Sequence, residues 1–432
     1  MKFKIHRGTK EIGGSCVEIW SETTRIVIDL GMPLVYPDKS QYDKKNLTQF
    51  KVSKLIKQGI LPNIKDLYEK DGHSVLLISH AHQDHYGLIN YLHKNTKIYL
   101  GEATLRLIEL TKTFTRQDYP LSNTKHFKSG EKFMVGDIQV TPYLMDHSAF
   151  DAYAFLIEVN GKSIFYSGDF RNHGRKAKVF KWFIHNTKKH IDYLLLEGTT
   201  IGRNNNPYPS ETELEMRFAD TFKNSKGINL IYTSGQNIDR LVSIYKACKN
   251  TGKTFIIDFY IANILKELSQ YASLPYPSSN FPDIKVFFPS AQRFREEDKK
   301  RLLYPFTDYK ITKDTIGNQY NKVVMLVRPS MIKDLKDIKN LDYGTFIYSL
   351  WDGYKKDKST KKLLDFIENK NMIEQQIHTS GHADINTLKK MVRSLKPKYI
   401  VPIHTFRGDT YEKIFTDSTI LKVDDNETVT IL

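Results

Sequence analysis

The stretch that decides the fold is Val75-Leu76-Leu77-Ile78-Ser79-His80-Ala81-His82-Gln83-Asp84-His85. The apolar run Val75–Ile78 predicts a buried strand, and four metal-ligand side chains follow within six positions. In an extended segment His80 and His82 point the same way, so both can bind one metal ion. Asp84 and His85 lie past the bend and can serve a second ion. Three imidazoles and a carboxylate suit zinc, with manganese or iron as weaker alternatives. A solvated His-rich loop is the alternative interpretation.

Other acidic and histidine residues stand where apolar strands end. They are Asp29 after Arg25–Ile28, Asp146-His147 after Asp137–Tyr143, Asp169 after Ser163–Tyr166, and His404 after Tyr399–Val401. A two-metal hydrolase needs ligands from several distant strands and an oxygen ligand that both ions share. Taken singly, a strand-end aspartate is more often a turn former. Taken together with the opening stretch, these residues predict one metal site at one edge of a sheet.

The whole set resembles a known family. The succession Asp29, His80-x-His82-x-Asp84-His85, His147, Asp169 resembles the metallo-β-lactamase fold. Leu194–Thr199 and Thr379–Ala383, with the closing His404, resemble the β-CASP group of nucleases, which includes ribonuclease J. Lys10–Cys16 and Thr233–Leu241 are similar to segments of ribonuclease J-like proteins. The resemblance covers nearly the whole chain. It implies an α/β fold, a metallo-β-lactamase αββα sandwich with an inserted parallel α/β β-CASP domain.

The resemblance also implies a role for each ligand. The first metal is expected on His80, His82 and His147, the second on Asp84, His85 and His404, and Asp169 is expected to bridge them. The expected metals are two Zn²⁺, with Mn²⁺ as the alternative. Asp29 is expected to orient a ligand histidine without touching a metal. A metal-bridging hydroxide is the expected nucleophile, and Asp84 is counted with the catalytic residues.

The leaving oxygen of the substrate needs a proton. His382 is expected to supply it as general acid, because imidazole can be charged around neutral pH. Glu197 is expected to orient His382 and to hold it protonated. Without the resemblance, a strand-end carboxylate in a turn is the simpler interpretation of Glu197.

Substrate-binding candidates lie in two loops. Ser234, Gly235, Gln236 and Asn237 follow a predicted strand and precede a predicted helix, where backbone N–H groups can hold a phosphate. By resemblance, Ser380 and Gly381 belong to a phosphate-binding loop. Asp384 stands where ribonuclease J commonly has serine, which adds a negative charge beside that loop.

Composition bounds the class of protein. The chain has 432 residues, of which 40% are hydrophobic and 26% charged, as in globular proteins. A net charge of +16 favours a polyanionic partner, most simply nucleic acid, although lysine-rich proteomes also produce basic proteins. The two cysteines, Cys16 and Cys248, fit a reducing compartment without disulfides. No apolar run reaches the roughly 18 residues of a membrane span, so a cytoplasmic protein without a membrane partner is predicted.

Residues 1–204 and 372–432 are expected to form a discontinuous metallo-β-lactamase domain around a β-CASP domain at 205–371. Within the insertion, predicted strands alternate with helices, the pattern of a parallel α/β unit. The predicted elements are a helix capped by Ser210, strands at Asn229–Tyr232, Lys253–Asp258, Ile284–Phe288, Lys322–Val327 and Gly344–Tyr348, and a helix at Ile238–Lys249. Residues 36–70 are expected to form a helical excursion. The C-terminal domain of ribonuclease J is expected to be missing, and a homodimer is left open.

The leading hypothesis is a di-zinc ribonuclease that hydrolyses RNA phosphodiester bonds, as an endonuclease, a 5′–3′ exonuclease or both. By resemblance, His404 points to RNA, because β-CASP enzymes that act on DNA usually carry valine there. The runner-up is a DNA nuclease of the same group. A small-molecule metallo-hydrolase is less favoured, because such enzymes generally lack the insertion and the Glu197/His382 pair. A catalytically inactive RNA-binding relative is disfavoured because every ligand position is filled.

Overall fold

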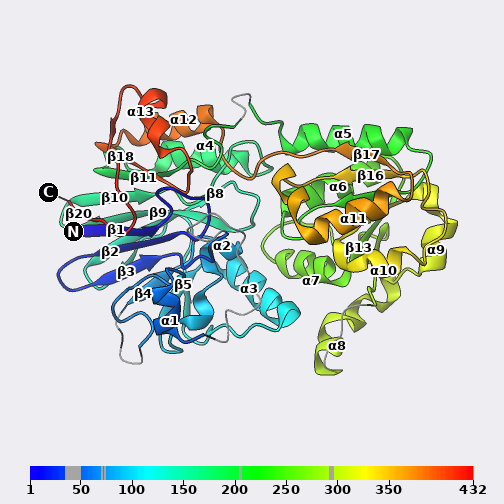
Figure 1. Ribbon diagram of the computed structural model, residues 1–432, viewed down its shortest axis with the longest axis horizontal. Helices are drawn as coiled ribbons and strands as arrows, with labels where there is room; N and C mark the ends of the chain where they lie inside the picture. Colours follow the sequence, from blue (N-terminus) through cyan, green and yellow to red (C-terminus); the bar gives the residue numbers. More distant parts are fainter. Residues whose placement is uncertain (35–49, 70–71, 73, 204–206, 291–295, 432) are drawn as a thin grey trace. The chain divides into compact units, whose positions relative to one another are not determined.

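The computed structural model describes residues 1–34, 50–69, 72, 74–203, 207–290 and 296–431. The chain forms two compact units (Figure 1). Unit 1 contains Met1–Asn172, Lys176–Pro207 and Gly381–Leu432, and unit 2 contains His173–Arg175 and Tyr208–Ser380. The chain therefore leaves unit 1, builds unit 2 and returns to complete unit 1.

Unit 1 is built on two seven-stranded sheets. The first sheet has, in spatial order, β20 (Thr428–Thr430), β1 (Lys2–Arg7), β2 (Cys16–Trp20), β3 (Arg25–Ile28), β4 (Val75–Leu77), β5 (Lys97–Leu100) and β6 (Thr124–His126). The second has β19 (Thr419–Ile420), β18 (Tyr399–Ile403), β11 (Tyr193–Glu197), β10 (Lys162–Tyr166), β9 (Ala152–Val159), β8 (Ile138–Met145) and β7 (Phe133–Val135).

The two sheets of unit 1 share one hydrophobic core. In β1, Phe3 and Ile5 are fully buried whereas Lys2 is exposed, which is the alternation expected of a strand with one face in a core. The short central strand β4 is buried along its whole length, as expected for a strand covered on both faces. Leu77 of β4 and Phe155 of β9 belong to the same core cluster, so the sheets pack face to face.

Helices cover the outer faces of this sandwich. On the second sheet, α4 (Ala177–Asn186), α12 (Ile385–Leu395) and α13 (Tyr411–Ile414) bury a separate apolar cluster. In α12, Leu388, Met391, Val392 and Leu395 are buried at the spacing of one helix face. Along the first sheet lie α1 (Val52–Lys57), α2 (Gln83–Tyr86) and α3 (Glu102–Thr115) (Figure 1). This layering confirms the predicted αββα sandwich.

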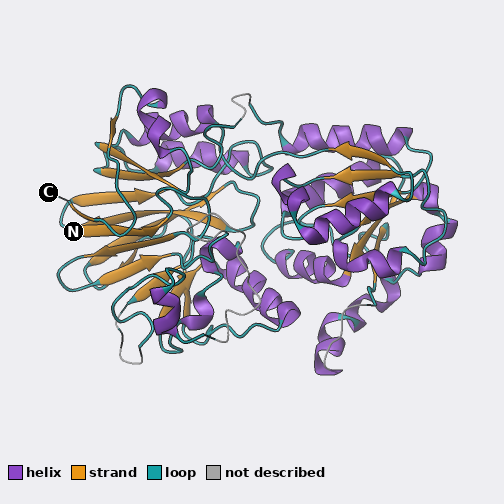
Figure 2. Ribbon diagram, viewed as in Figure 1, coloured by secondary structure: helices purple, strands orange, loops and turns teal. Residues whose placement is uncertain are grey.

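Unit 2 is a parallel α/β unit. Its six-stranded sheet has the order β14 (Ile284–Phe287), β13 (Thr254–Asp258), β15 (Val323–Leu326), β12 (Asn229–Tyr232), β16 (Thr345–Tyr348) and β17 (Ile373–Gln376), and every pairing is parallel. Helices pack on both of its faces (Figure 2). The helices of unit 2 are α5 (Glu211–Asn224), α6 (Ile238–Asn250), α7 (Phe259–Leu268), α8 (Glu296–Leu302), α9 (Lys313–Asn318), α10 (Ile332–Leu335) and α11 (Lys358–Glu368), of which α8 projects away from the sheet (Figure 1).

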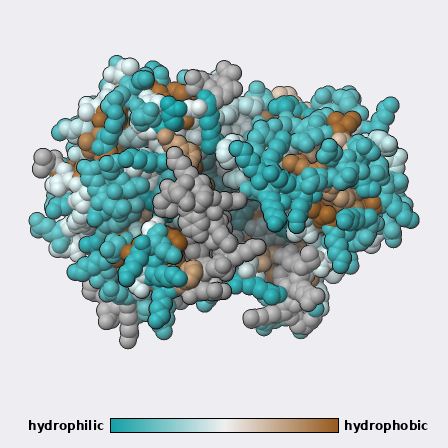
Figure 3. Space-filling model, in the orientation of Figure 1, coloured by the Kyte–Doolittle hydropathy of each residue, from teal (hydrophilic) through white to brown (hydrophobic). Residues whose placement is uncertain are grey.

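The predicted strands of the insertion and the helix predicted at Ile238–Lys249 are confirmed to within one residue at each end. Ser210 caps α5, where its side chain accepts from the Glu213 N–H and Glu213 reaches back in a capping box. Of the helical excursion predicted for 36–70, residues 36–49 and 70 lie outside the described residues, and α1 is the helix seen in 50–69. Among the described residues, no helix has both the length and the apolar character needed to cross a membrane. The visible surface of each unit is mainly hydrophilic (Figure 3).

Candidate metal centre

The metal-ligand candidates of unit 1 stand at the carboxyl ends of strands. His80 follows β4, His147 follows β8, Asp169 follows β10, and His404 follows β18. In the second sheet β10, β11 and β18 are parallel, so their carboxyl ends lie at one edge. The register pairs Glu197 with Ile403, which places His404 one residue beyond the carboxylate of Glu197 on the neighbouring strand.

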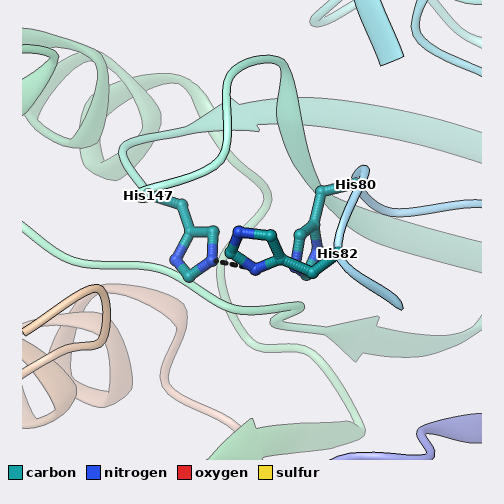
Figure 4. A group of neighbouring side chains, drawn as sticks. All are labelled: His80, His82 and His147. Atoms are coloured by element: carbon teal, nitrogen blue, oxygen red, sulfur yellow. Dashed lines mark hydrogen bonds between the residues drawn. The ribbon is translucent and has the colours of Figure 1, made fainter. Parts of the chain in front are cut away.

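One group of candidate ligands consists of three imidazoles. Ligand atoms of His80, His82 and His147 lie within 4.8 Å of one another, and the rings point toward one another (Figure 4). His147 Nε2 lies 3.3 Å from His82 Nδ1. The other nitrogen of His147, Nδ1, lies 2.6 Å from the carbonyl oxygen of Gly381 and donates to it, which leaves Nε2 as an acceptor. Burial lowers the pKa of all three histidines, for His82 to about 4, so they are held as neutral imidazoles.

A second group consists of Asp84, His85 and His404, again with ligand atoms within 4.8 Å. His404 has a left-handed backbone conformation, with φ of 49°. Its Nε2 accepts the Gly13 N–H at 3.0 Å, and its Nδ1 lies 2.8 Å from Thr199 Oγ1. Both nitrogens of His404 therefore have partners within the chain, and a metal ion would take the place of one of them.

Asp169 lies between the two groups. Its Oδ2 is 3.2 Å from His85 Nε2 and 3.9 Å from His80 Nε2, and its Oδ1 is 3.7 Å from His404 Nδ1. Burial by itself raises the pKa of Asp169, but the surrounding His404, His85 and His382 outweigh it and hold the pKa well below its ordinary value. A buried carboxylate kept anionic among imidazoles is suited to bridge two cations.

Asp29 holds the candidate ligand His85 in place from the end of β3. It has a left-handed backbone with φ of 62° at the end of β3. Its Oδ1 accepts from the Ser79 N–H at 2.7 Å, and its Oδ2 lies 2.8 Å from Ser79 Oγ, His85 Nδ1 and Tyr166 Oη. The contact between Asp29 Oδ2 and His85 Nδ1 fixes the His85 ring and leaves its Nε2 facing Asp169. Burial lowers the pKa of His85, but the carboxylates of Asp169 and Asp29 outweigh this and raise it well above its ordinary value.

Glu197 and His382 form a carboxylate–imidazole pair beside the ligands. His382 Nδ1 lies 3.3 Å from Glu197 Oε2 and 3.7 Å from Asp169 Oδ2. The carboxylate of Glu197 is held by the N–H groups of Phe170 and Thr199, each at 3.2 Å. Burial lowers the pKa of His382, but Glu197 and then Asp169 outweigh it, and the net pKa is raised.

The chemistry of these side chains fits a metal. Among the described residues, His80 Nε2 is a buried nitrogen without a hydrogen-bond partner, and the buried His85 Nε2 faces the Asp169 carboxylate at 3.2 Å. An unsatisfied buried nitrogen is costly unless something coordinates it. Both nitrogens belong to groups whose ligand atoms converge, and imidazole with carboxylate is a donor set that zinc accepts.

Four residues that hold this site escaped the sequence prediction. Gly13 and Thr199 contact His404, and Tyr166 and Ser79 contact Asp29. Gly13 and Thr199 lie inside stretches that the sequence marks as motifs, which was the available signal. Tyr166 ends an apolar strand and carries no such signal.

The predicted substrate-binding residues belong to different units. Ser234, Gly235, Gln236 and Asn237 join β12 to α6 in unit 2, where Asn237 caps α6 by accepting from the Arg240 N–H. Ser380, also in unit 2, gives its carbonyl to His173 Nε2 at 2.8 Å. Gly381 is in unit 1 and gives its carbonyl to His147. Asp384 has a local role, because its side chain accepts from the Thr387 N–H as the N-cap of α12.

Comparison with known proteins defines the class. Residues 56–226 match the family described as "Beta-lactamase superfamily domain", and residues 369–411 match the "Zn-dependent metallo-hydrolase RNA specificity domain". The second match and the His/Asp cluster together indicate a metal cofactor.

The relatives in sequence include ribonucleases J. Ribonuclease J of Helicobacter pylori (strain 26695) is 27% identical over 92% of this chain and 55% of its own length. An "RNase J-like protein" of Methanocaldococcus jannaschii is 24% identical over 97% of this chain and 95% of its own length. The chain therefore matches metallo-hydrolase domain families in two segments and is similar to ribonuclease J-like proteins, and it spans about half the length of the Helicobacter relative.

A solved structure shares the fold. A protein of unknown function from Enterococcus faecalis V583 superposes with a TM-score of 0.79 at 20% identity, covering 100% of this chain and 99% of that one. At this identity the likeness concerns the fold alone.

Proposed function

We propose that the chain is a metal-dependent ribonuclease that hydrolyses RNA phosphodiester bonds. The observation that carries the proposal is the arrangement in unit 1, where two groups of metal ligands flank Asp169 and the Glu197–His382 pair lies beside them. Unit 1 is proposed as the metallo-β-lactamase domain and unit 2 as the inserted β-CASP domain.

The proposed cofactors are two Zn²⁺ ions. His80, His82 and His147 would hold one ion, Asp84, His85 and His404 the other, and Asp169 would be shared. Bound there, the ions would polarise the phosphate and activate water for attack on phosphorus. The low pKa of His80, His82 and His147 supports this assignment, because a neutral imidazole binds a metal without first losing a proton.

The proton for the leaving oxygen is proposed to come from His382. The carboxylates of Glu197 and Asp169 raise the pKa of His382, which favours the charged ring that has a proton to donate. Glu197 holds Nδ1 at 3.3 Å, and two backbone N–H groups fix Glu197 in turn. The ring orientation is thereby set by the protein before substrate arrives, which leaves Nε2 as the nitrogen that can reach a leaving group.

RNA is the proposed substrate, with DNA as the alternative. Support comes from the net charge of +16, from the matched RNA specificity domain and from the ribonuclease J relatives. Cleavage inside the chain, from the 5′ end, or both fits the same chemistry. The loops at 234–237 and 380–381 are proposed to contact substrate phosphates.

The metal content and ester preference of the purified chain test this proposal. We expect two zinc ions per chain by elemental analysis. The zinc-loaded protein should hydrolyse bis(p-nitrophenyl) phosphate, and a chelator should abolish the reaction. Faster hydrolysis of a thioester or a lactone than of the phosphodiester would instead support a small-molecule hydrolase, and a chain without stoichiometric metal would support an inactive relative.

A further inference from the structure

Three basic residues of β1 face the same way because the strand contains a bulge. Lys4 pairs with Glu18 and Ile5 with Val17, but Arg7 pairs with Cys16, so His6 is the extra residue. Without the bulge, Arg7 would share the face of Ile5, which lies in the core. With it, Arg7 shares the face of Lys4. Bulges commonly re-aim side chains next to functional sites.

This basic face borders a cavity of about 450 Å³ in unit 1. Part of its lining, the basic wall, consists of Lys4, His6 and Arg7, and another part, the apolar wall, is formed after α1 by residues that include Ile60 and Leu61. A cavity of this size falls within the range of small-molecule sites, about 300–1,000 Å³. A ligand with one anionic end and one flat apolar end would match both walls.

The charges of the cavity favour an anion. No aspartate or glutamate is among the described residues that line it. Glu18, which pairs with Lys4 across the strands, is bound to His6 Nε2 at 2.8 Å and to Arg25. Arg7 pairs with Glu11 through Nε at 3.3 Å. Lys4 forms no ion pair with a described residue and is half-buried, so its charge is the one available to a ligand.

The cavity shares backbone with the candidate metal centre. Gly14 lines the cavity, and the preceding residue, Gly13, donates its N–H to His404. Gly31 also lines it, and a Cβ at Gly31 would lie 1.7 Å from the carbonyl oxygen of Asp84. Two segments that line the cavity, at Gly14 and at Gly31, therefore lie directly beside the candidate metal ligands His404 and Asp84.

We propose that this cavity binds the phosphate of a nucleotide, with Lys4 as the contacting cation and the base or ribose against the apolar wall. The nucleotide is either one unit of an RNA chain or a free nucleoside monophosphate. The first source rests on the proposed ribonuclease function, whereas the second does not.

Lys4→Gln removes the charge with little change of shape, and Lys2→Gln is its matched control. Lys2 lies on the same strand and carries the same charge, but it is exposed and does not line the cavity. Both variants keep the metal centre, so any binding of phosphate to metal is common to them. Circular dichroism and zinc content check that each variant is folded.

Two titrations use these variants. In the first, AMP is titrated into the zinc-loaded full chain by calorimetry. In the second, binding of a labelled oligoribonucleotide is followed by anisotropy at several salt concentrations, with His382→Ala added to every variant to prevent cleavage. We expect Lys4→Gln to weaken binding about tenfold, the size of one charge-assisted hydrogen bond. For RNA, the slope of log affinity against log salt should fall by about 0.7.

The pattern identifies the source of the phosphate. A loss in the RNA titration alone supports a phosphate of the RNA chain, and a loss with AMP supports a site open to free nucleotide. Equal binding by the wild type, Lys4→Gln and Lys2→Gln in both titrations would overturn the proposal. Failure of the ribonuclease proposal leaves the AMP titration unaffected, so the two failures are distinguishable.

Discussion

Replacing Asp29 by asparagine tests how the second group of metal ligands is held. Asp29 has φ of 62°, a conformation that asparagine tolerates, so the backbone of β3 is not strained by the change. The amide oxygen can keep the bond to the Ser79 N–H, now 2.7 Å long. The amide NH₂ must then stand where Oδ2 lies 2.8 Å from His85 Nδ1.

The consequence falls on the His85 tautomer. An NH₂ group donates to Nδ1 and moves the ring proton to Nε2, the atom that lies 3.2 Å from Asp169 Oδ2. A protonated Nε2 cannot bind a metal. Loss of an outer hydrogen-bond partner of a ligand histidine typically lowers metal affinity about 10–100-fold. We therefore expect Asp29→Asn to weaken one of the two metals by about 1.4–2.7 kcal/mol.

Zinc retained per chain, measured against a graded series of chelator concentrations, gives this affinity. Asp192→Asn is the matched control, because Asp192 accepts from the Ser163 N–H and Oγ at 2.8 and 2.9 Å but contacts no candidate ligand. Asp29→Asn should lose one zinc at lower chelator concentration than wild type, whereas Asp192→Asn should not. Wild-type retention of both ions by Asp29→Asn would refute the reasoning about His85.

Four further outcomes are expected. His382→Ala should lower kcat about 10²–10⁴-fold with zinc content unchanged. Glu197→Gln should also lower kcat and shift the pH profile of kcat, because the Glu197 carboxylate raises the pKa of His382. An unchanged pH profile would contradict the pairing of Glu197 with His382. Burial and then the Arg240 guanidinium lower the pKa of His378 to about 3. Because that value is below the unfolded value of about 6.5, the contribution of His378 to the free energy of unfolding is complete above about pH 6.5 and decreases toward pH 3, by about 3 kcal/mol at pH 4. Urea unfolding of His378→Asn should therefore show a correspondingly smaller loss of stability on acidification. Arg240→Met should lower the free energy of unfolding in urea by about 3–5 kcal/mol, because it leaves the buried carboxylate of Glu211, which Arg240 binds at 3.0 and 3.1 Å, without its counter-charge. The double variant Arg240→Met/Glu211→Leu should regain most of this loss.

Much of the fold follows from local sequence pattern. The strand β12 was predicted at Asn229–Tyr232 and is found there, because its apolar run is bounded by polar turns on both sides. His80, His147, Asp169 and His404 each follow such a run within three residues, so their places at strand ends could be predicted locally. The strand β17 lies beyond the predicted boundary at residue 371 and pairs with β16, and its sequence Ile-Glu-Gln-Gln gives no apolar signal because it is an edge strand.

The rest depends on contacts between distant residues. Gly13 reaches His404 across 391 positions, and Thr199 reaches it across 205. No local pattern indicates such pairs. Asp384 shows the opposite case: its spacing to Thr387 is an ordinary helix-capping signal, and the structure gives it that role.

The most direct test of the central claim is cleavage of matched, end-labelled single-stranded RNA and DNA by the zinc-loaded chain. The account predicts that RNA is cut by the wild type and not by His382→Ala, and that a chelator stops the reaction; the product ladder then separates internal cuts from release of 5′ mononucleotides. Cutting of DNA alone would contradict the choice of RNA, and no cutting of either polymer by the metal-replete protein would contradict the nuclease function itself.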